Sequence, residues 1–378
     1  MMMKGKFCAA ALLAAMLLFW GSCTKTELRE EAGGTVSLTV VTSDTQTRAP
    51  SGDPADGGGI VVDGSGNPDL AIIIADSEGS LVAWYPSDFL TGLSMNVNYL
   101  SECTTEHDPS VNAMASTVRF TGIQRGNYTV YAFANKSGLS TSELTALRGC
   151  VSASGIDALQ LSVESGKYPS FSEVMPLSAR ASLFVNASGN GQVDVPLLRP
   201  VARVSMTFRN LTEEDISIYD CRVSIGAMNP ERGYLVQNSP DLVPSYDRDL
   251  EFSSAGPLVF GDDPDVPGEY LRSTLPVRQV FPSVAPERLV GSRYLCTISF
   301  HVKKPDVTYD PDDPDTYDDV TFPDLPVHDS RSSDIQFLKR NQFLKIETRI
   351  TKRAAEFDYS FNFDVMTWTE KENYLTFD

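Results

Sequence analysis

Histidine is scarce in this chain of 378 residues: only His107, His301 and His328 occur. None has a second histidine at the spacing that metal-binding motifs use. The sequence also has no G-x-S-x-G nucleophile motif and no glycine-rich phosphate loop that opens a helix. Scattered carboxylates could pair in three dimensions as in a glycosidase, but no pair stands out. We therefore expect no catalytic site, no cofactor and no metal site.

Basic residues are outnumbered by acidic ones. The chain has 31 Lys and Arg against 50 Asp and Glu, and its formal net charge is −19. Nucleic acid binding requires clustered basic side chains that meet the phosphates, so this balance excludes nucleic acid as a partner. A large negative charge suits a soluble, self-repelling surface protein.

Long hydrophobic runs are absent except for one, from Phe7 to Trp20, which follows Lys4 and Lys6 and precedes Gly21-Ser22-Cys23. As a helix of about 14 residues it would span only roughly 21 Å of a hydrocarbon core of about 30 Å. We expect residues 1–22 to be a lipoprotein signal peptide, Cys23 to carry lipid that anchors the chain to the outer membrane, and residues 23–34 to be a polar tether. An ordinary signal peptide cleaved nearby is the alternative.

Cysteine is infrequent and no C-x-x-C pair occurs, which argues against a zinc site. With Cys8 in the leader and Cys23 lipidated, four cysteines remain. In an oxidising compartment their simplest pairing is Cys103–Cys150 and Cys221–Cys296, although four unpaired thiols stay an open alternative.

Short alternating runs separated by turn residues dominate the rest of the chain, which predicts an all-β fold. The residues of Thr35–Thr42 alternate between polar and apolar, as in a half-buried strand. The best helical candidate is Ser142–Val163, with Ser142 as a possible N-cap, interrupted by Gly149 and Gly155. Further predicted strands are Leu70–Ala75, Leu81–Tyr85, Thr117–Phe120, Tyr128–Ala134, Ser182–Asn186, Gln192–Pro196, Val201–Leu211, Ile216–Ile225, Leu258–Phe260, Gln279–Phe281, Arg293–Val302, Phe343–Thr351 and Phe357–Val365.

The strand rhythm restarts after Pro200, and the mature chain is too long for one small core. We therefore expect two β-sandwich domains with minor helix, at 35–200 and 201–378. Two acidic loops, Gly261–Asp265 and Tyr309–Asp319, carry enough carboxylates to suggest calcium. The prolines and the lack of a D-x-D-x-D-G register favour solvated hairpin tips instead.

Four segments, in this order, resemble Bacteroidales fimbrillins, the type V pilins. The first is Phe120–Asn135, which reads FTGIQRGNYTVYAFAN, and the second is the turn Met175-Pro176-Leu177-Ser178. The third, Leu197–Val204, reads LLRPVARV, and Phe363–Trp368 is similar to the closing strand of the family. Each segment alone would also fit an ordinary sandwich strand or turn; their order behind the leader carries the resemblance.

The resemblance implies two tandem transthyretin-like (Greek-key) β-sandwiches and assembly by strand exchange. In that family an Arg-specific protease removes the first strand, and a C-terminal strand of another subunit fills the groove by β-augmentation. Here the excised strand would be Thr35–Thr42 and the cut would follow Arg48, in a polar stretch open to proteolysis. Arg29 is an alternative cut that precedes the strand.

The donor strand is expected in the last stretch of the chain. Its candidates are Phe357, Tyr359, Phe361, Phe363, Val365 and Trp368. An alternative is that Phe357–Val365 is the last internal strand and that Trp368–Phe377 is the donor.

The expected function is thus a non-enzymatic fimbrial subunit on the surface of a Bacteroidales-type bacterium, supporting adhesion. Its expected partners are other fimbrial subunits, the protease, the outer membrane through its lipid, and a host protein or glycan. Two alternatives stay open: a fimbrial anchor that keeps its lipid, and a surface lipoprotein that binds a glycan or host protein. Exposed aromatic clusters on loops would favour the latter, and the sequence offers only Trp84, Tyr85 and Trp368 for them.

Overall fold

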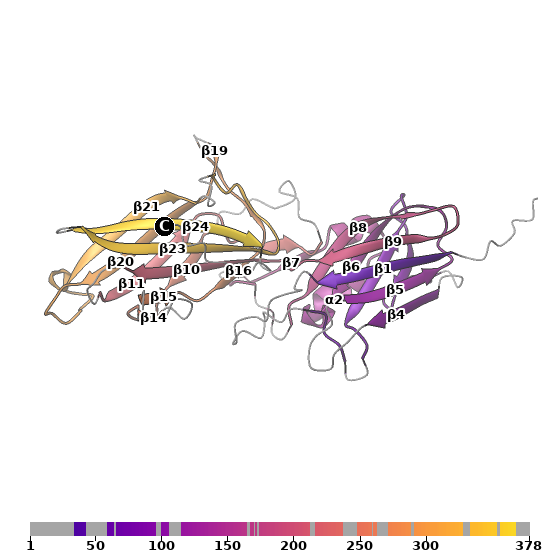
Figure 1. The fold of residues 1–378 in the computed structure, drawn as a ribbon, viewed down its shortest axis with the longest axis horizontal. Coiled ribbons are helices and arrows are strands. Elements are labelled where there is room, and N and C mark those ends of the chain that lie inside the picture. Colours follow the sequence, from indigo (N-terminus) through magenta and orange to yellow (C-terminus); the bar gives the residue numbers. More distant parts are fainter. Residues whose placement is uncertain are drawn as a thin grey trace, which may run out of the picture.

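The computed structural model describes residues 34–42, 59–63, 66–95, 100–105, 115–164, 167–169, 171, 174–211, 216–236, 248–258, 260–262, 271–288, 291–327, 333–353 and 356–367. They form an elongated molecule of two β-rich lobes arranged along the long axis (Figure 1). We call residues 34–201 the N-terminal half and residues 202–367 the C-terminal half. Strand makes up 53% and helix 8%, which confirms the mostly-β prediction with minor helix. The transthyretin-like assignment stays a prediction.

The N-terminal half is a sandwich of two four-stranded sheets, in the orders β4-β5-β1-β9 and β3-β2-β6-β8. Helices α2 and α3 lie against the outer face of the second sheet. The elements are β1 (Thr35–Thr42), β2 (Leu70–Ala75), β3 (Leu81–Tyr85), β4 (Leu100–Thr105), β5 (Ala115–Thr121), β6 (Gly126–Ala134), η2 (Lys136–Gly138), α2 (Thr141–Arg148), α3 (Ala153–Asp157), β7 (Gln160–Ser162), β8 (Leu177–Val185) and β9 (Gly191–Leu197).

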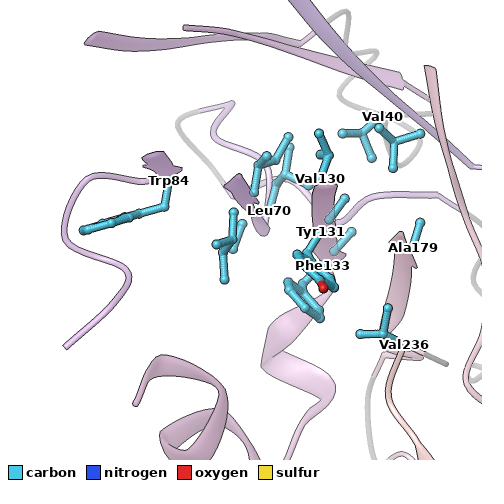
Figure 2. Packing of buried hydrophobic residues seen from close by; sticks show 14 of the residues in the cluster. Val40, Leu70, Trp84, Val130, Tyr131, Phe133, Ala179 and Val236 are labelled. Atoms are coloured by element: carbon cyan, nitrogen blue, oxygen red, sulfur yellow. The ribbon is translucent and has the colours of Figure 1, made fainter. Parts of the chain in front are cut away.

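The core of this half lies on both sides of its second sheet. All six residues of β2 are buried, because one face meets the first sheet and the other meets the helices. Figure 2 shows Val40 from β1 and Val130 from β6 on the side between the sheets, and Tyr131 and Phe133 on the side of the helices. The Tyr131 hydroxyl donates to the carbonyl of Ala153 (3.5 Å). An all-apolar strand is expected where both faces are covered.

The predicted helical stretch, Ser142–Val163, contains two short helices, but its last part is wrong, because Gln160–Ser162 forms strand β7 and pairs with β12. Helix α2 starts after Ser140 rather than Ser142, because Ser140 forms a capping box with Glu143. Gly149 is its C-cap, and Ser152 caps α3 through the Gly155 amide.

The C-terminal half again contains two large sheets, in the orders β14-β15-β10-β23-β24 and β13-β11-β20-β21, with β16 also paired to β10. Two small sheets, β17-β22 and β18-β19, are additional. Its elements are β10 (Ala202–Asn210), β11 (Ile218–Ile225), β12 (Arg232–Tyr234), β13 (Leu250–Ser253), β14 (Gly261–Asp262), β15 (Leu271–Thr274), β16 (Arg278–Val280), β17 (Ser283–Val284), β18 (Glu287–Arg288), β19 (Gly291–Ser292), β20 (Leu295–Lys303), η4 (Pro314–Thr316), β21 (Tyr317–Pro326), β22 (Phe337–Leu338), β23 (Gln342–Arg353) and β24 (Glu356–Thr367).

The two halves repeat one strand arrangement. Strands β1, β2, β3, β4, β5, β6, β8 and β9 correspond to β10, β11, β13, β14, β15, β20, β21 and β23, with the same neighbours in each sheet. Directions match as well: β1 and β10 are each antiparallel to one neighbour (β5, β15) and parallel to the other (β9, β23). Among the described residues, two strands of these sheets have no counterpart in the N-terminal half: the short β16, and β24, which is antiparallel to β23 and lies at the edge of the sheet.

Several sequence expectations need correction here. Strands β4, β13, β15 and β21 were not predicted, and Leu258 forms only an isolated bridge with Ile218. The acidic stretch Tyr309–Asp319 is not loop throughout, because Tyr317 already opens β21. The other acidic loop, Gly261–Asp265, begins with β14, and its last three residues lie outside the described ranges. The first hydrophobic cluster runs to Val201 but also takes in Leu235, Val236 and Phe281, and the second begins at Ala202. Independent folding of 35–200 and 201–378 stays a prediction.

A buried arginine joins the halves. Arg340 is 3% exposed and donates to the carbonyl oxygens of Arg199 (3.2 Å), Ser178 (3.1 Å), Leu198 (2.9 Å) and Val236, and to the Ser178 hydroxyl (2.6 Å). Burial lowers the pKa of Arg340 to about 9, so the side chain is still a cation at neutral pH. Strands β7 and β12 add a two-stranded sheet between the halves, visible at the waist in Figure 1.

Replacing Arg340 with Met should therefore destabilise the junction. Several buried carbonyls lose a charged donor, for which we expect a loss of about 2–5 kcal/mol in the free energy of unfolding. Urea unfolding followed by circular dichroism measures it. The neighbouring exposed residue supplies the control, since Lys339→Met should change stability by less than about 0.5 kcal/mol. Equal effects of the two variants would show that the Arg340 hydrogen bonds do not hold the halves together.

Candidate functional site

Strand β1, the first of the described strands, lies in the interior of its sheet rather than at an edge. Strand β1 lies between β5, to which it is antiparallel, and β9, to which it is parallel. Both of its edges are therefore hydrogen-bonded. Figure 1 shows it along the long axis of the N-terminal half.

Alternation gives β1 one core-facing side. Val36, Leu38 and Val40 are fully buried, whereas Ser37 and Thr39 between them are only partly buried. The three apolar residues are in register with Phe120, Val118 and Ser116 of β5 and with Gly191, Val193 and Val195 of β9. The predicted half-buried strand is thereby confirmed, with the predicted bounds.

The start of β1 is fitted tightly against the turn between β8 and β9. A Cβ atom on Gly34 would lie 2.2 Å from the carbonyl oxygen of Ser188, so the backbone can pass only as glycine. The amide of Thr35 donates to the Asn190 side chain (2.9 Å). These contacts set the register in which the strand enters the sheet.

Removing β1 would cost the half much of its stability. Burying a Val or Leu side chain is worth about 1.5–3 kcal/mol, so the three residues contribute on the order of 5–9 kcal/mol. A domain is stable by only about 5–15 kcal/mol in total. The vacated slot would also expose two unpaired strand edges. A half without β1 therefore needs another strand in its place.

The other predicted assembly residues are placed only in part. Cys23, Arg48 and Trp368 lie outside the described residues, as do His107 and His328. Phe357, Tyr359, Phe361, Phe363 and Val365 all belong to β24. They are in register with Lys352, Ile350, Thr348, Ile346 and Leu344 of β23. The sequence leaves two interpretations of this segment open: a donor strand, or the last internal strand of the second sandwich. In this single chain it is the last internal strand, paired with β23.

The disulfide prediction is wrong: Cys103, Cys150, Cys221 and Cys296 are all thiols. Cys296 is in register with Ile225, four residues along β11 from Cys221, or about 13 Å at ~3.3 Å per residue. A disulfide needs Cα atoms about 4.4–6.8 Å apart. Cys103 lies on β4, while Cys150 follows α2 and its thiol donates to the Ala146 carbonyl (3.4 Å). The open alternative of four unpaired thiols is the one observed.

Two features of the described residues had no sequence signal. One is Arg340, whose partners lie more than 100 residues away in sequence. The other is a surface cluster of three tyrosines, a histidine and an aspartate at the outer end of the C-terminal half. Within the described ranges no three His, Cys, Asp or Glu side chains are grouped to hold a metal ion. Among those residues no helix is both long and apolar enough to cross a membrane.

The contribution of β1 can be measured directly. Leu38→Ala should lower the free energy of unfolding by about 2–5 kcal/mol, because a fully buried side chain is truncated. Ser37→Ala, on the opposite side of the same strand, should change it by less than about 0.5 kcal/mol. A small effect of Leu38→Ala in chemical denaturation would mean that the slot holds β1 only loosely.

Thiol reactivity should separate the four cysteines. Burial raises the pKa of Cys221 and Cys296 to about 12, and it raises that of Cys150 as well. At pH 8 these groups hold even less reactive thiolate than an ordinary cysteine. We expect the half-buried Cys103 to be labelled first by iodoacetamide, and Cys221 and Cys296 only after unfolding, as read by peptide mass spectrometry. Early labelling of Cys221 or Cys296 would contradict their burial.

Comparison with known proteins finds likeness in structure. No protein-family model and no curated protein sequence matches the chain. Among solved structures, a fimbrilin (FimA) from Porphyromonas gingivalis is 12% identical, with a TM-score of 0.48, over 88% of this chain and 97% of that chain. The tip fimbrial protein Mfa3 from the same species, with a C-terminal truncation, is 11% identical, with a TM-score of 0.45, over 88% and 99%. A Bacteroides eggerthii protein with a proposed role in cell adhesion is 12% identical, with a TM-score of 0.47, over 89% and 97%.

Proposed function

We propose that this chain is a structural subunit of a bacterial surface fimbria, assembled by exchange of β1 for a strand of another subunit. The observation that carries the proposal is the position of β1. It is the first of the described strands, yet it fills an interior slot with three buried side chains and two hydrogen-bonded edges. The four sequence segments that resemble fimbrillins support the same proposal.

The proposed trigger is proteolysis after Arg48, six residues beyond the end of β1. A cut there breaks the covalent connection between β1 and the rest of the chain, so only noncovalent contacts keep β1 in the slot. A strand delivered at high local concentration can then replace it, because an incoming backbone satisfies both exposed edges.

The proposed donor is the end of the chain, from β24 onward. Each half has its own set of eight corresponding strands, and β24 is additional to both. Loss of β24 removes an edge strand and leaves the other neighbours of β23 and β10 in place, whereas loss of β1 opens the interior of a sheet. A surplus edge strand is the one that a folded subunit can release.

Export and anchoring complete the proposal. The leader delivers the chain as a lipoprotein with lipid on Cys23, which ties the uncut precursor to the outer membrane. Because the cut after Arg48 removes both the lipid and β1, one event frees the subunit and opens its slot. A subunit that keeps its lipid would instead serve as an anchor.

Assembly after cleavage tests the proposal. A leaderless chain (residues 24–378) treated with an Arg-specific protease should acquire Ala49 as its N-terminus and form oligomers in size-exclusion chromatography. Arg48→Gln should remain monomeric under the same treatment, whereas Arg29→Gln should assemble normally. A chain that is cut after Arg48 but stays monomeric would overturn strand exchange.

Intact-mass analysis of protein from the native cell surface decides between subunit types. A lipidated Cys23 still joined to the rest of the chain would exclude a shaft subunit and leave the anchor. Lipid-free protein that begins at Ala49 would support the shaft subunit.

A further inference from the structure

An aromatic cluster lies on the outer face of the sheet β13-β11-β20-β21. It consists of Tyr219 and Asp220 on β11, His301 on β20, Tyr309 in the connection that follows, and Tyr317 at the start of β21; we call these five residues the tyrosine patch. The rings of Tyr219 and Tyr309 stack with centroids 4.0 Å apart, and those of His301 and Tyr317 with centroids 3.8 Å apart. All five side chains are at least partly exposed.

Hydrogen bonds hold the patch in one arrangement. The Tyr309 hydroxyl donates to the Asp220 carboxylate and lies 2.9 Å from His301 Nδ1. His301 Nδ1 is also 3.6 Å from the same carboxylate. Asp220 sits at a β-bulge with φ of +48°, a conformation that few non-glycine residues adopt. A bulge re-aims a side chain, and here it turns the carboxylate toward the rings.

The patch lies at the outer end of the C-terminal half, beside a strongly acidic connection. Ile218 pairs with Val302, and Ile225, near the junction of the halves, pairs with Cys296, so the connection after Lys303 leaves the sheet at its outer end. Figure 1 shows that connection at the end remote from the N-terminal half. Residues 303–319 contain seven aspartates and two lysines. An anionic ligand would be repelled from this end.

Two described turns at the opposite end of the molecule carry one basic side chain and no acidic one. The turn between β5 and β6, and the neighbouring turn between β8 and β9, lie beside the start of β1. Residues 121–126 and 186–190 of these turns contain one charged side chain, Arg125, and no acid. Arg125 is exposed, and no described carboxylate forms an ion pair with it.

We propose that the tyrosine patch of one subunit receives Arg125 of the next copy of this chain. The inference rests on the proposed fimbrial function, in which elongated subunits meet end to end. A guanidinium stacks on tyrosine rings and pairs with carboxylates at once, which an ammonium does less well. The chain carries a net charge of −19, so copies repel one another except where opposite charges meet. The two ends supply such a place.

Charge reversal on each side tests the contact. Elongation of protease-cleaved chain is followed by light scattering in about 0.15 M salt. Asp220→Arg and Arg125→Asp should each slow elongation about tenfold, since close interfacial charge pairs contribute more than 1 kcal/mol. A chain that carries both substitutions restores the opposite charges at each contact and should recover most of the elongation rate. Asp312→Arg makes the same charge change in the exposed acidic segment outside the rings and should alter the rate by less than about twofold.

Failure of this contact and failure of the fimbrial function give different results. If no variant and no unmodified chain assembles after cleavage, the proposed function fails, and this contact fails with it. If the unmodified chain assembles and both reversed variants match its rate, the contact alone is overturned. Slowed single variants without recovery in the double variant would also overturn Arg125 as the partner. Thermal unfolding of each uncleaved variant, expected within a few degrees of the unmodified chain, guards against loss of folding.

Discussion

One buried cation determines how this molecule is put together. Arg340 of the C-terminal half donates to the carbonyl oxygens of Ser178 and Leu198 in the N-terminal half, and to that of Val236, which follows β12. A guanidinium taken out of water must find acceptors, and here they are supplied almost entirely by backbone. Backbone acceptors have fixed positions in a sheet. These hydrogen bonds therefore tie the C-terminal half to fixed points on the backbone of the N-terminal half.

The repeated strand arrangement gives the two halves different capacities. Strand β10 and strand β1 hold the same position in their sheets, but β10 is continuous with the chain on both sides. Strand β1 is followed by a polar stretch that contains Arg48, where the proposed cut would detach it from the rest of the chain. If the proposed cut occurs, the same interior position would be permanent in the C-terminal half and replaceable in the N-terminal half. In the proposed assembly, the additional strand β24 of one subunit would fill the position that β1 leaves in the next subunit.

The sequence predicts a strand best where the strand's own residues show which of its faces are buried. The alternation in Thr35–Thr42 predicted β1 with its bounds, and the apolar run in Leu70–Ala75 predicted β2. Strand β4, which reads LSECTT, was missed because a polar strand at a sheet edge shows neither pattern. Arg340 and the tyrosine patch could not be predicted, because their contacts join residues far apart in sequence. The disulfide pairing failed for the same reason, since register and not spacing decides which cysteines meet.

The orientation of β1 has a mechanical consequence. Strands β1, β5 and β9 run along the long axis of the molecule (Figure 1), and their ladder hydrogen bonds point across it. Tension applied along the axis to a strand seated in this slot acts in shear, so every rung on both edges resists together. A strand pulled sideways would instead lose its rungs one at a time. A filament built through this slot would resist flow over a cell surface with the combined strength of two ladders.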